Sequence, residues 1–337
     1  SGMVLDDASP SVLGHLSKNI RIAVLKTPLV DEDVGVAASI RIVNPQSMKK
    51  QDFIKGGTAT SQMLDFLSEC IRYGISVCVA GATSSGKTTL LGWLLTTIPD
   101  GKRIYSIENG SRELALVRRK DGRVVNSVIH TLTRDSENER QRIDQIALLD
   151  IALRFNPDII AVGEIRDGET AGIAMRSAIT GHLVMSTLHT NDAISAVYRL
   201  RDIGVEPWLV ASALRGVISQ RLVRKICPHC KTAYQPSEEE LALLGMPEDS
   251  QTTFYKGVGC PECRHTGYVG RRAAFEILMV NREVRRLVND DAAYDELLAA
   301  AKKNGYRTMR DSCRDLVLRG ITTAEEAART INSTLDE

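Results

Sequence analysis

The feature that most constrains this chain is an eight-residue glycine loop. Residues 81–88 read Gly-Ala-Thr-Ser-Ser-Gly-Lys-Thr and match the pattern G-x-x-x-x-G-K-[ST]. An apolar, β-branched run precedes the loop at 75–80, and a helical pattern follows it at 88–98. A strand, a glycine loop and a helix N-terminus together bind anions, because backbone N–H groups and the helix dipole face the ligand. The sequence therefore predicts a nucleoside triphosphate site.

The loop also predicts the roles of individual residues. We expect Lys87 to reach the β- and γ-phosphates and the Thr88 hydroxyl to ligate Mg²⁺. The predicted ATP-binding residues are Gly81, Ala82, Thr83, Ser84, Ser85, Gly86, Lys87, Thr88 and Thr89.

The composition is that of an ordinary soluble globular protein. Of the 337 residues, 43% are hydrophobic and 25% are charged. The formal net charge of +1 gives no overall reason to expect a nucleic-acid or acidic-membrane partner. No apolar run approaches the ~20 residues that span a bilayer, and no signal peptide is visible, so we expect a cytoplasmic protein. Ser1-Gly2-Met3 resembles a cloning remnant, so we expect the natural N-terminus to lie upstream.

Strand and helix patterns alternate along the chain after the glycine loop, which favours a mostly parallel sheet covered on both faces. Strands are predicted at 103–107, 124–130, 158–162 and 183–188, and helices at 136–155, 167–179 and 191–203. Two strands at 20–25 and 36–43 and a helix at 61–73 come before the loop. The chain ends in predicted helices at 282–288, 292–303, 308–318 and 323–331.

These patterns predict an α/β fold in four parts. Residues 1–72 form a partial N-terminal α+β domain with a linker helix, and residues 73–225 form the nucleotide-binding core. Residues 226–270 form a cysteine-bearing insert, and residues 271–337 form a C-terminal helical region.

Two glutamates follow predicted strands at the sheet edge where ligands bind in open α/β folds. Glu164 ends the segment 156–164, Asn-Pro-Asp-Ile-Ile-Ala-Val-Gly-Glu, and is predicted to orient or deprotonate the attacking water. Most glycine-loop enzymes carry an Asp just before this Glu to support Mg²⁺, but here that position is Gly163. Glu108, at the end of the strand 103–107, is therefore the candidate metal support. A solvated strand-end glutamate is the alternative interpretation of either residue.

His189 follows the predicted strand 183–188, so we expect it at the same sheet edge as Glu164. There it is a candidate to hydrogen-bond the γ-phosphate and to report hydrolysis to the next segment. A structural histidine with satisfied hydrogen bonds explains the same position equally well.

Two Cys-x-x-Cys pairs predict a structural zinc site, because two such turns can offer four thiolates tetrahedrally to one Zn²⁺. The predicted ligands are Cys227, Cys230, Cys260 and Cys263. A disulfide or redox pair is the alternative, which a cytosolic chain disfavours. His229 and His265 are candidate substitute ligands.

Four ordered motifs give the chain a resemblance to a known family. The glycine loop, the acidic turn at 107–109, the segment 157–167 and the segment 181–191 resemble the Walker A, Asp box, Walker B and His box of the secretion-superfamily ATPases. The resemblance covers roughly residues 20–335 and implies a RecA-like P-loop core. By that analogy Glu164 is the catalytic glutamate, Glu108 the Asp-box acid and His189 the His-box residue.

The resemblance also implies an assembly. The family comprises hexameric motors that drive type II secretion, type IV pilus assembly and retraction, and type IV secretion. It therefore implies a homo-hexamer with ATP between neighbouring subunits and an inner-membrane platform protein as partner, with other secretion or pilus components. Association with the inner face of the cytoplasmic membrane would be peripheral, through those partners.

Different segments of the chain resemble different branches of the family. The four-cysteine insert is typical of the type II secretion and pilus-assembly branch (GspE/PilB-like), whereas pilus-retraction motors lack it. The stretch 29–74 is more similar to the tight-adherence and type IV secretion branch. The acidic turn reads Glu108-Asn109-Gly110, so an amide replaces a carboxylate that the family usually has.

Hydrolysis in such rings requires a positive charge donated across the subunit interface. Arg134 and Arg142, in the polar stretch after the strand 124–130, are the favoured candidates. Solvated surface charge is the alternative for each.

Together these features predict a hexameric, Mg²⁺-dependent ATPase that powers type IV pilus assembly or type II protein secretion. A pilus-retraction, type IV secretion or DNA-uptake ATPase of the same superfamily is the first alternative. A nucleic-acid translocase is another, but the chain has no basic run with interleaved aromatics. Asn109 and Gly163 favour a further alternative, a nucleotide-regulated scaffold that binds ATP without turnover.

Overall fold

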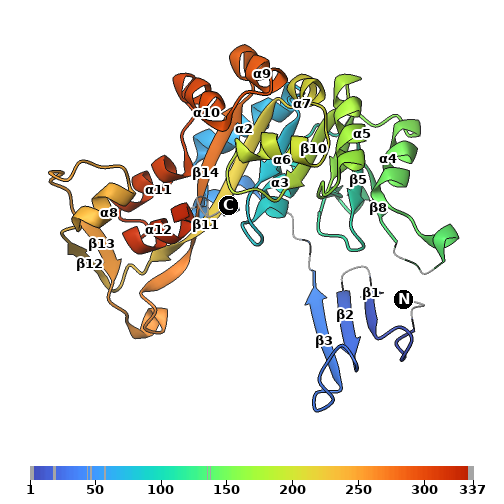
Figure 1. Ribbon diagram of the computed structural model, residues 1–337, viewed down its shortest axis with the longest axis horizontal. Helices are drawn as coiled ribbons and strands as arrows, with labels where there is room; N and C mark the ends of the chain where they lie inside the picture. Colours follow the sequence, from blue (N-terminus) through green and yellow to red (C-terminus); the bar gives the residue numbers. More distant parts are fainter. Residues whose placement is uncertain are drawn as a thin grey trace.

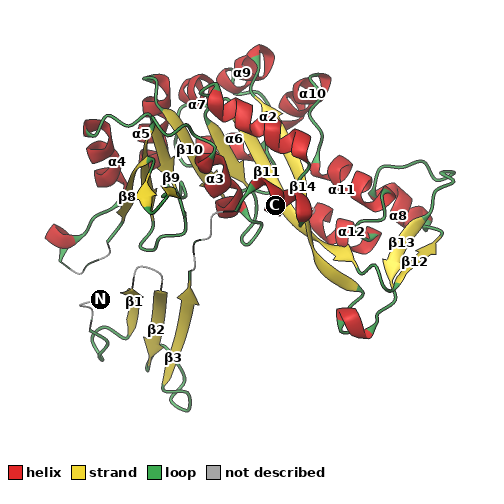
Figure 2. Cartoon of the chain, turned by 180° about the vertical axis from the view of Figure 1, so that it is seen from behind, coloured by secondary structure: helices red, strands yellow, loops and turns green. Residues whose placement is uncertain are grey.

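A seven-stranded sheet forms the centre of the computed structural model, which describes residues 4–17, 20–43, 45, 48–56, 58–134, 136 and 138–332 (Figures 1 and 2). The strand order is β14-β11-β4-β10-β9-β5-β8. The strands are β4 (Val77–Ala80), β5 (Arg103–Glu108), β8 (Ser127–Leu132), β9 (Ile159–Val162), β10 (Leu183–Leu188), β11 (Gly216–Ile226) and β14 (Tyr268–Met279). Every neighbouring pair is parallel except β11 with β14. The predicted α/β fold with a mostly parallel sheet is confirmed.

Strand β4 shows why both faces of this sheet are buried. Val77 and Val79 pack into one hydrophobic cluster, with α2 (Ser61–Arg72) and α3 (Lys87–Thr96), while Cys78 and Ala80 pack into the cluster on the opposite face. Successive side chains of a strand point to opposite faces, so an unbroken apolar run is stable between two helical layers. The opposite layer contains α4 (Gln145–Arg154), α5 (Gly168–Ile179), α6 (Ser195–Asp202), α7 (Pro207–Ala213), α9 (Arg282–Asn289) and α10 (Tyr294–Lys303).

The predicted helix at 136–155 is wrong in its first half. Before α4, the described residues hold a 3₁₀ turn, η1 (Glu139–Gln141), and an antiparallel bridge between Arg134 and Ile143. The start of α4 is set by Asp144, whose carboxylate accepts a hydrogen bond from the Ala147 N–H at 2.9 Å. An Asp at this position satisfies a helix-end donor, so the polar residues before it stay outside the helix.

A separate antiparallel sheet precedes the core, in the order β1-β2-β3 (Figure 1). Its strands are β1 (Ser11–Ser17), β2 (Ile20–Lys26) and β3 (Val36–Ile42), followed by the helix α1 (Lys50–Lys55). Strand β1 was missed by the sequence patterns. In the core, the predicted strand at 124–130 begins only at Ser127, because a hairpin of β6 (Arg119–Lys120) and β7 (Arg123–Val124) takes up its first residues.

Strands β11 and β14 extend beyond the core as a two-stranded arm that carries the cysteine segment (Figure 2). The elements packed along the arm are β12 (Lys231–Tyr234), α8 (Glu238–Leu243), β13 (Phe254–Gly257), η2 (Pro261–Cys263), α11 (Met309–Leu318) and α12 (Ala324–Asn332). All of these except η2 contribute to or pack against one hydrophobic cluster, which includes Leu244, Phe254 and Val317. Because β11 and β14 run across residues 225 and 270, the four-part division of the chain stays a prediction.

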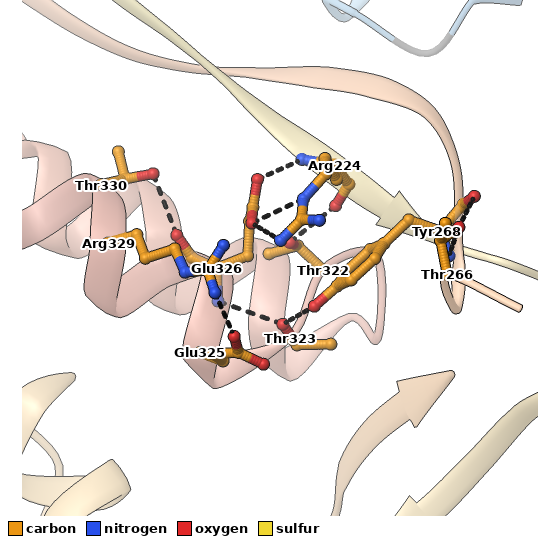
Figure 3. Close-up of polar contacts among 9 residues, drawn as sticks. All are labelled: Arg224, Thr266, Tyr268, Thr322, Thr323, Glu325, Glu326, Arg329 and Thr330. Carbon is orange, nitrogen blue, oxygen red and sulfur yellow. Dashed lines mark hydrogen bonds and ion pairs between the residues drawn. The ribbon is translucent and has the colours of Figure 1, made fainter. Parts of the chain in front are cut away.

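Arg224 joins the arm to the last helix (Figure 3). Its guanidinium donates to Glu326 Oε2 at 2.8 and 2.6 Å, and its backbone N–H donates to Oε1 at 3.0 Å. The guanidinium carbon lies 4.0 Å from the centre of the Tyr268 ring, and the Tyr268 hydroxyl lies 2.9 Å from Thr323 Oγ1. Burial acts to raise the pKa of Glu326, but the hydrogen bonds from Arg224 outweigh it and lower that pKa. Charge-assisted contacts of this kind fix α12 against β11, next to the cysteine segment.

Candidate active site and cysteine cluster

The glycine loop joins β4 to α3 and adopts backbone angles that glycine permits. Gly81 has a φ of 143° and Gly86 a φ of 88°. A Cβ at Gly81 would lie 2.4 Å from the carbonyl oxygen of Gln220, and one at Gly86 would lie 2.7 Å from Gln220 Nε2. Gln220 Nε2 also donates to the Ser85 carbonyl at 2.6 Å. Gln220 of strand β11 therefore packs against the glycine loop and binds it, a contact that no sequence pattern indicated.

Two adjoining cavities open beside the loop. One, of about 610 Å³, is lined by residues 83–89 together with Met48 and Arg271. The other, of about 300 Å³, shares Lys87 and Thr88 with the first. Its further lining includes three predicted site residues, Glu108, Glu164 and His189. The glycine loop, the cavities beside it and the Lys87 ammonium group fit a nucleoside triphosphate. The structure brings Glu108, Glu164 and His189 to the lining of the smaller cavity.

Lys87 is a nearly buried cation, with 7% of its surface exposed. Its Nζ donates to the carbonyl oxygens of Gly81 and Ala82 at 2.8 and 2.9 Å. Burial lowers the pKa of Lys87, and the charge of Glu164 opposes that shift. The loop therefore holds the ammonium group at the cavity wall.

Glu164 lies just beyond the end of β9, between two basic side chains. Its Oε2 accepts from Arg166 at 2.8 Å, and its Oε1 lies 3.3 Å from His189 Nε2. Burial acts to raise the pKa of Glu164, but Arg166, His189 and Lys87 outweigh burial and lower it. The carboxylate is therefore ionised at neutral pH.

His189 follows β10, as predicted. Burial and the charge of Lys87 lower its pKa, against the opposing effect of Glu164. The ring is therefore mainly neutral at neutral pH and is able to act as a hydrogen-bond donor toward the cavity.

The backbone before Glu164 is closely packed. A Cβ at Gly163 would lie 3.3 Å from the Ile107 carbonyl oxygen and 3.8 Å from Glu108 Cγ. An aspartate there would crowd the neighbouring strand and approach a second carboxylate. Gln145, the first residue of α4, donates from Nε2 to the Glu164 carbonyl at 3.0 Å, a supporting contact that the sequence patterns missed.

Glu108 is deeply buried, and one of its oxygens is already bound. Oε2 accepts from the backbone N–H groups of Glu113 and Leu114 at 2.6 and 2.9 Å. Oε1 lies 3.6 Å from His130 Nδ1 and, among the described residues, has no hydrogen-bond partner. Glu108 therefore orders the loop at 109–114 and leaves one oxygen for a cation, so its metal role stays a prediction.

Two arginines from the N-terminal sheet also line the smaller cavity, and the sequence patterns missed both. Arg21 on β2 and Arg41 on β3 are direct cross-strand partners. They lie 3.9 and 3.1 Å from Glu113 Oε1. Burial lowers the pKa of Arg21, with Glu113 opposing the shift. The sequence did hold a clue to this pair. Arg21 lies near the start of the predicted strand 20–25 and Arg41 near the end of the predicted strand 36–43, so pairing the two strands as a hairpin would have placed the arginines opposite each other.

Neither of the two predicted arginine fingers lines the two cavities beside the glycine loop of its own chain, here called the phosphate cavities. Arg134 is exposed and donates from Nε to the Gln141 carbonyl at 2.8 Å. Arg142 lines a different cavity, of about 460 Å³, between the core and the N-terminal sheet. A role for either across a subunit interface stays a prediction.

The four predicted cysteine ligands lie together at the end of the arm. Their Sγ atoms all lie within 4.8 Å of one another, with pairs at 3.7, 3.8 and 3.9 Å. Four thiolates around one Zn²⁺ at ~2.3 Å give sulfur separations of ~3.8 Å. Burial acts to raise the pKa of the Cys263 thiol, but the backbone N–H groups of Cys260 and Gly267 outweigh it and lower that pKa to about 6. The cluster is compatible with zinc, and neither His229 nor His265 belongs to it.

Comparison with known proteins decides the family. A profile of the family described as Type II/IV secretion system protein matches residues 11–329. The chain belongs to this family. The resemblance inferred from the four motifs is therefore confirmed.

Two relatives within the type II/IV secretion family show the range of its members. Type II secretion system protein E of Pseudomonas aeruginosa is 40% identical over 266 residues, which are 78% of this chain and 50% of that protein. Type IV pilus assembly ATPase PilB of Thermus thermophilus is 41% identical over 262 residues, which are 77% of this chain and 28% of that protein. In each case the matched region is half of the relative's length or less.

A solved structure supports the fold. The X-ray structure of the Legionella pneumophila ATPase DotB superposes with a TM-score of 0.62 at 20% sequence identity and covers 96% of this chain and 77% of that one. In the described part of the chain, no helix combines the length and the apolar character needed to cross a membrane.

Proposed function

We propose that this member of the type II/IV secretion family hydrolyses ATP to ADP and phosphate in a Mg²⁺-dependent reaction. The observation that carries the proposal is the shared cavity wall, where the glycine loop, Lys87, Glu164 and His189 meet. A relative that is 41% identical carries the name of an ATPase. A loop suited to binding phosphates and an ionised carboxylate suited to activating water thus line the same cavity.

The residues of the loop would bind the phosphates. Backbone N–H groups at 83–86 face the anion, and the Lys87 ammonium exchanges its carbonyl partners for phosphate oxygens. Arg21 and Arg41 would add positive charge from the N-terminal sheet. Thr88 and the free oxygen of Glu108 are the candidate Mg²⁺ ligands, and the bound ion would neutralise charge on the leaving phosphates.

Glu164 would orient the attacking water. Its carboxylate is ionised, so it can accept a hydrogen bond from the water as the water approaches the γ-phosphorus. Arg166 donates to one of its carboxylate oxygens. Neutral His189 carries a single N–H, which would donate to the γ-phosphate once ATP is bound and to Glu164 Oε1, 3.3 Å away, in its absence.

We infer that the four cysteines hold a structural zinc ion. The ion would tie the two Cys-x-x-Cys turns together and leave no open position for catalysis. Its site lies on the arm rather than in the phosphate cavity.

The assembly follows from the family rather than from this single chain. We propose a homo-hexamer at the inner face of the cytoplasmic membrane, held there by an inner-membrane platform protein and other machinery components. Arg134 or Arg142 would reach a neighbour's ATP. The names of the two relatives support type II secretion or type IV pilus assembly as the process.

The test compares Glu164→Gln with a matched control, Glu169→Gln, an exposed glutamate in the first turn of α5. We expect wild type and control to release phosphate in a Mg²⁺-dependent manner. Glu164→Gln should bind ATP normally but turn over at least ~10²-fold more slowly, because the group that activates water is neutralised. Light scattering should show turnover rising with hexamer formation.

Three outcomes would contradict parts of this proposal. Full turnover in Glu164→Gln would remove its assigned role. ATP binding without turnover in a wild-type hexamer would favour a nucleotide-regulated scaffold. Stimulation by DNA or RNA would favour a translocase.

A further inference from the structure

Glu276 is a buried carboxylate that the proposed reaction does not use. It belongs to β14, has 3% of its surface exposed and pairs across the sheet with Ser219 of β11. A buried carboxylate is costly unless its oxygens are satisfied by hydrogen bonds. Its partners therefore show what it stabilises.

Each carboxylate oxygen of Glu276 binds a different segment. Oε2 accepts from the Ala193 N–H at 2.7 Å, and Oε1 accepts from the Met309 N–H at 2.5 Å. Ala193 lies in residues 189–194, here called the His189 loop, which connects β10 to α6. Met309 is the first residue of α11. One side chain thus joins the His189 loop, four residues beyond His189, to the start of a C-terminal helix.

The rest of the His189 loop is also held from the sheet. Arg221 on β11 donates to the Asn191 carbonyl at 3.3 Å and to Asn191 Oδ1 at 2.6 Å. Asp192 Oδ1 accepts from the N–H of Ser195, the first residue of α6, at 2.7 Å. Gln220, the neighbour of Arg221, supports the glycine loop. Strand β11 therefore supports both the glycine loop and the His189 loop, and Glu276 on the edge strand β14 extends this network to α11.

The charged and titratable groups around Glu276 come from four segments. Burial raises its pKa to about 7, and the charge of Asp192 adds to that effect. The Ala193 and Met309 N–H groups and the Tyr306 hydroxyl act in the opposite direction. Tyr294 on α10 and Cys313 on α11 also face it, and its charge raises the pKa of each.

We propose that Glu276 is a positioning residue that ties the His189 loop to the start of α11 while its carboxylate is ionised. An ionised carboxylate accepts both N–H groups strongly, whereas a protonated one keeps a single good acceptor oxygen. Protonation therefore loosens one of the two connections. The ATP-site loop and the C-terminal helices are coupled most firmly above neutral pH.

The main variant is Glu276→Gln, which preserves shape but replaces one acceptor oxygen by an NH₂ donor. The control is Glu283→Gln, an exposed glutamate on α9. Amide hydrogen exchange of the segment around Ala193, measured at pH 8, reads the coupling without any need for turnover. We expect protection there to fall ~10-fold in Glu276→Gln and to stay unchanged in the control.

Steady-state kinetics give the second readout, which rests on the proposed ATPase function. In wild type, kcat should fall as the pH drops through about 7, the pKa of Glu276. In Glu276→Gln, kcat at pH 8 should be ~10-fold lower with little change in KM, and the step near pH 7 should disappear. Burial and Lys87 lower the pKa of His189, and the loss of the step in Glu276→Gln assigns it to Glu276 rather than to His189.

Tyr306→Phe provides a variant that keeps the carboxylate. Loss of the tyrosine hydroxyl removes a hydrogen bond that lowers the pKa of Glu276, so the step in wild-type kcat should move to higher pH. Unchanged exchange near Ala193 in Glu276→Gln, or a pH step unmoved by either variant, would overturn the proposal. A wild type without turnover would overturn the proposed function alone, because the exchange experiment would still test the coupling.

Discussion

At the scale of single residues, the pKa values of the half-buried Glu164 and the buried Glu276 shift in opposite directions because their neighbours differ. Glu164 faces Arg166, His189 and Lys87, and the hydrogen bond from Arg166 with the electrostatic effects of all three groups overcomes the effect of burial on its pKa. Glu276 faces the like charge of Asp192, which adds to burial and raises its pKa to about 7. The first stays ionised at neutral pH, as its proposed role requires, and the second is able to change charge near neutral pH.

Glu276 should therefore make stability depend on pH. Its pKa is about 7 in the folded chain and 4.5 in the reference state, so the folded state retains a proton that the unfolded state loses between these values. The free energy of unfolding contributed by this group is fully present below pH 4.5 and is lost as the pH rises through 7. The difference is on the order of 3 kcal/mol.

Denaturant unfolding of wild type and Glu276→Gln at several pH values checks this expectation. The variant should gain stability relative to wild type as the pH rises from 4.5 to 7, with no further gain above that. If the free energies of unfolding of wild type and variant changed equally with pH across this range, Glu276 would have an ordinary pKa.

At the scale of secondary-structure elements, the residues that cap the starts of helices also position residues of the candidate site. Asp144 and Asp167 cap α4 and α5 by accepting N–H bonds from Ala147 and Thr170 at 2.9 and 2.8 Å. Because α4 begins at Gln145, that side chain reaches the Glu164 carbonyl. The cap thus sets both the start of α4 and the contact of Gln145 with the backbone of Glu164.

Asp144→Ala should destabilise the protein by about 1 kcal/mol, the usual cost of losing an N-cap. Asp150→Ala, an exposed aspartate within the same helix, should change the free energy of unfolding by less than ~0.5 kcal/mol. Thermal or denaturant unfolding of both variants measures the difference. Equal effects of the two substitutions would mean that the cap does not set the start of α4.

At the scale of the whole molecule, the phosphate cavity and the cysteine cluster lie on different parts of the fold. The cavity is bounded by the core and by Arg21 and Arg41 of the N-terminal sheet. The cysteine cluster lies at the end of the β11–β14 arm, which Arg224 and Glu326 join to α12 (Figure 3). Loss of metal should therefore affect the arm before it affects nucleotide binding.

Zinc removal tests this division. We expect the purified protein to carry about one zinc ion per chain, and Cys227→Ser to lose it, because three thiolates bind the ion more weakly. Chelation should lower the melting temperature while ATP binding persists, since folding of such a cluster depends on its metal. Cys70→Ser, a buried cysteine on α2, should keep its zinc. Wild type that contains no zinc and melts identically with chelator would contradict the prediction.

Much of the fold follows from local patterns. The apolar run of β4, the glycine loop and α3 are contiguous, so their geometry is determined within about 20 residues. The predicted helix at 136–155 began too early, because Asp144 starts α4 through a side-chain hydrogen bond that periodicity does not reveal. Strand β1 was missed because its side chains have little apolar alternation and it is stabilised by pairing with β2.

The sequence by itself determined the phosphate loop and the glutamate and histidine that follow buried strands, because each depends on residues close together in the chain. It also determined the four-cysteine set, because each half is a short Cys-x-x-Cys turn that is recognisable on its own. Only the tertiary structure decided which distant side chains complete these sites. Arg21 and Arg41 meet the phosphate cavity through a hairpin pairing, and Gln220 reaches the glycine loop from β11. Glu276 acts through backbone N–H groups, which every non-proline residue carries, so no residue pattern identifies its partners.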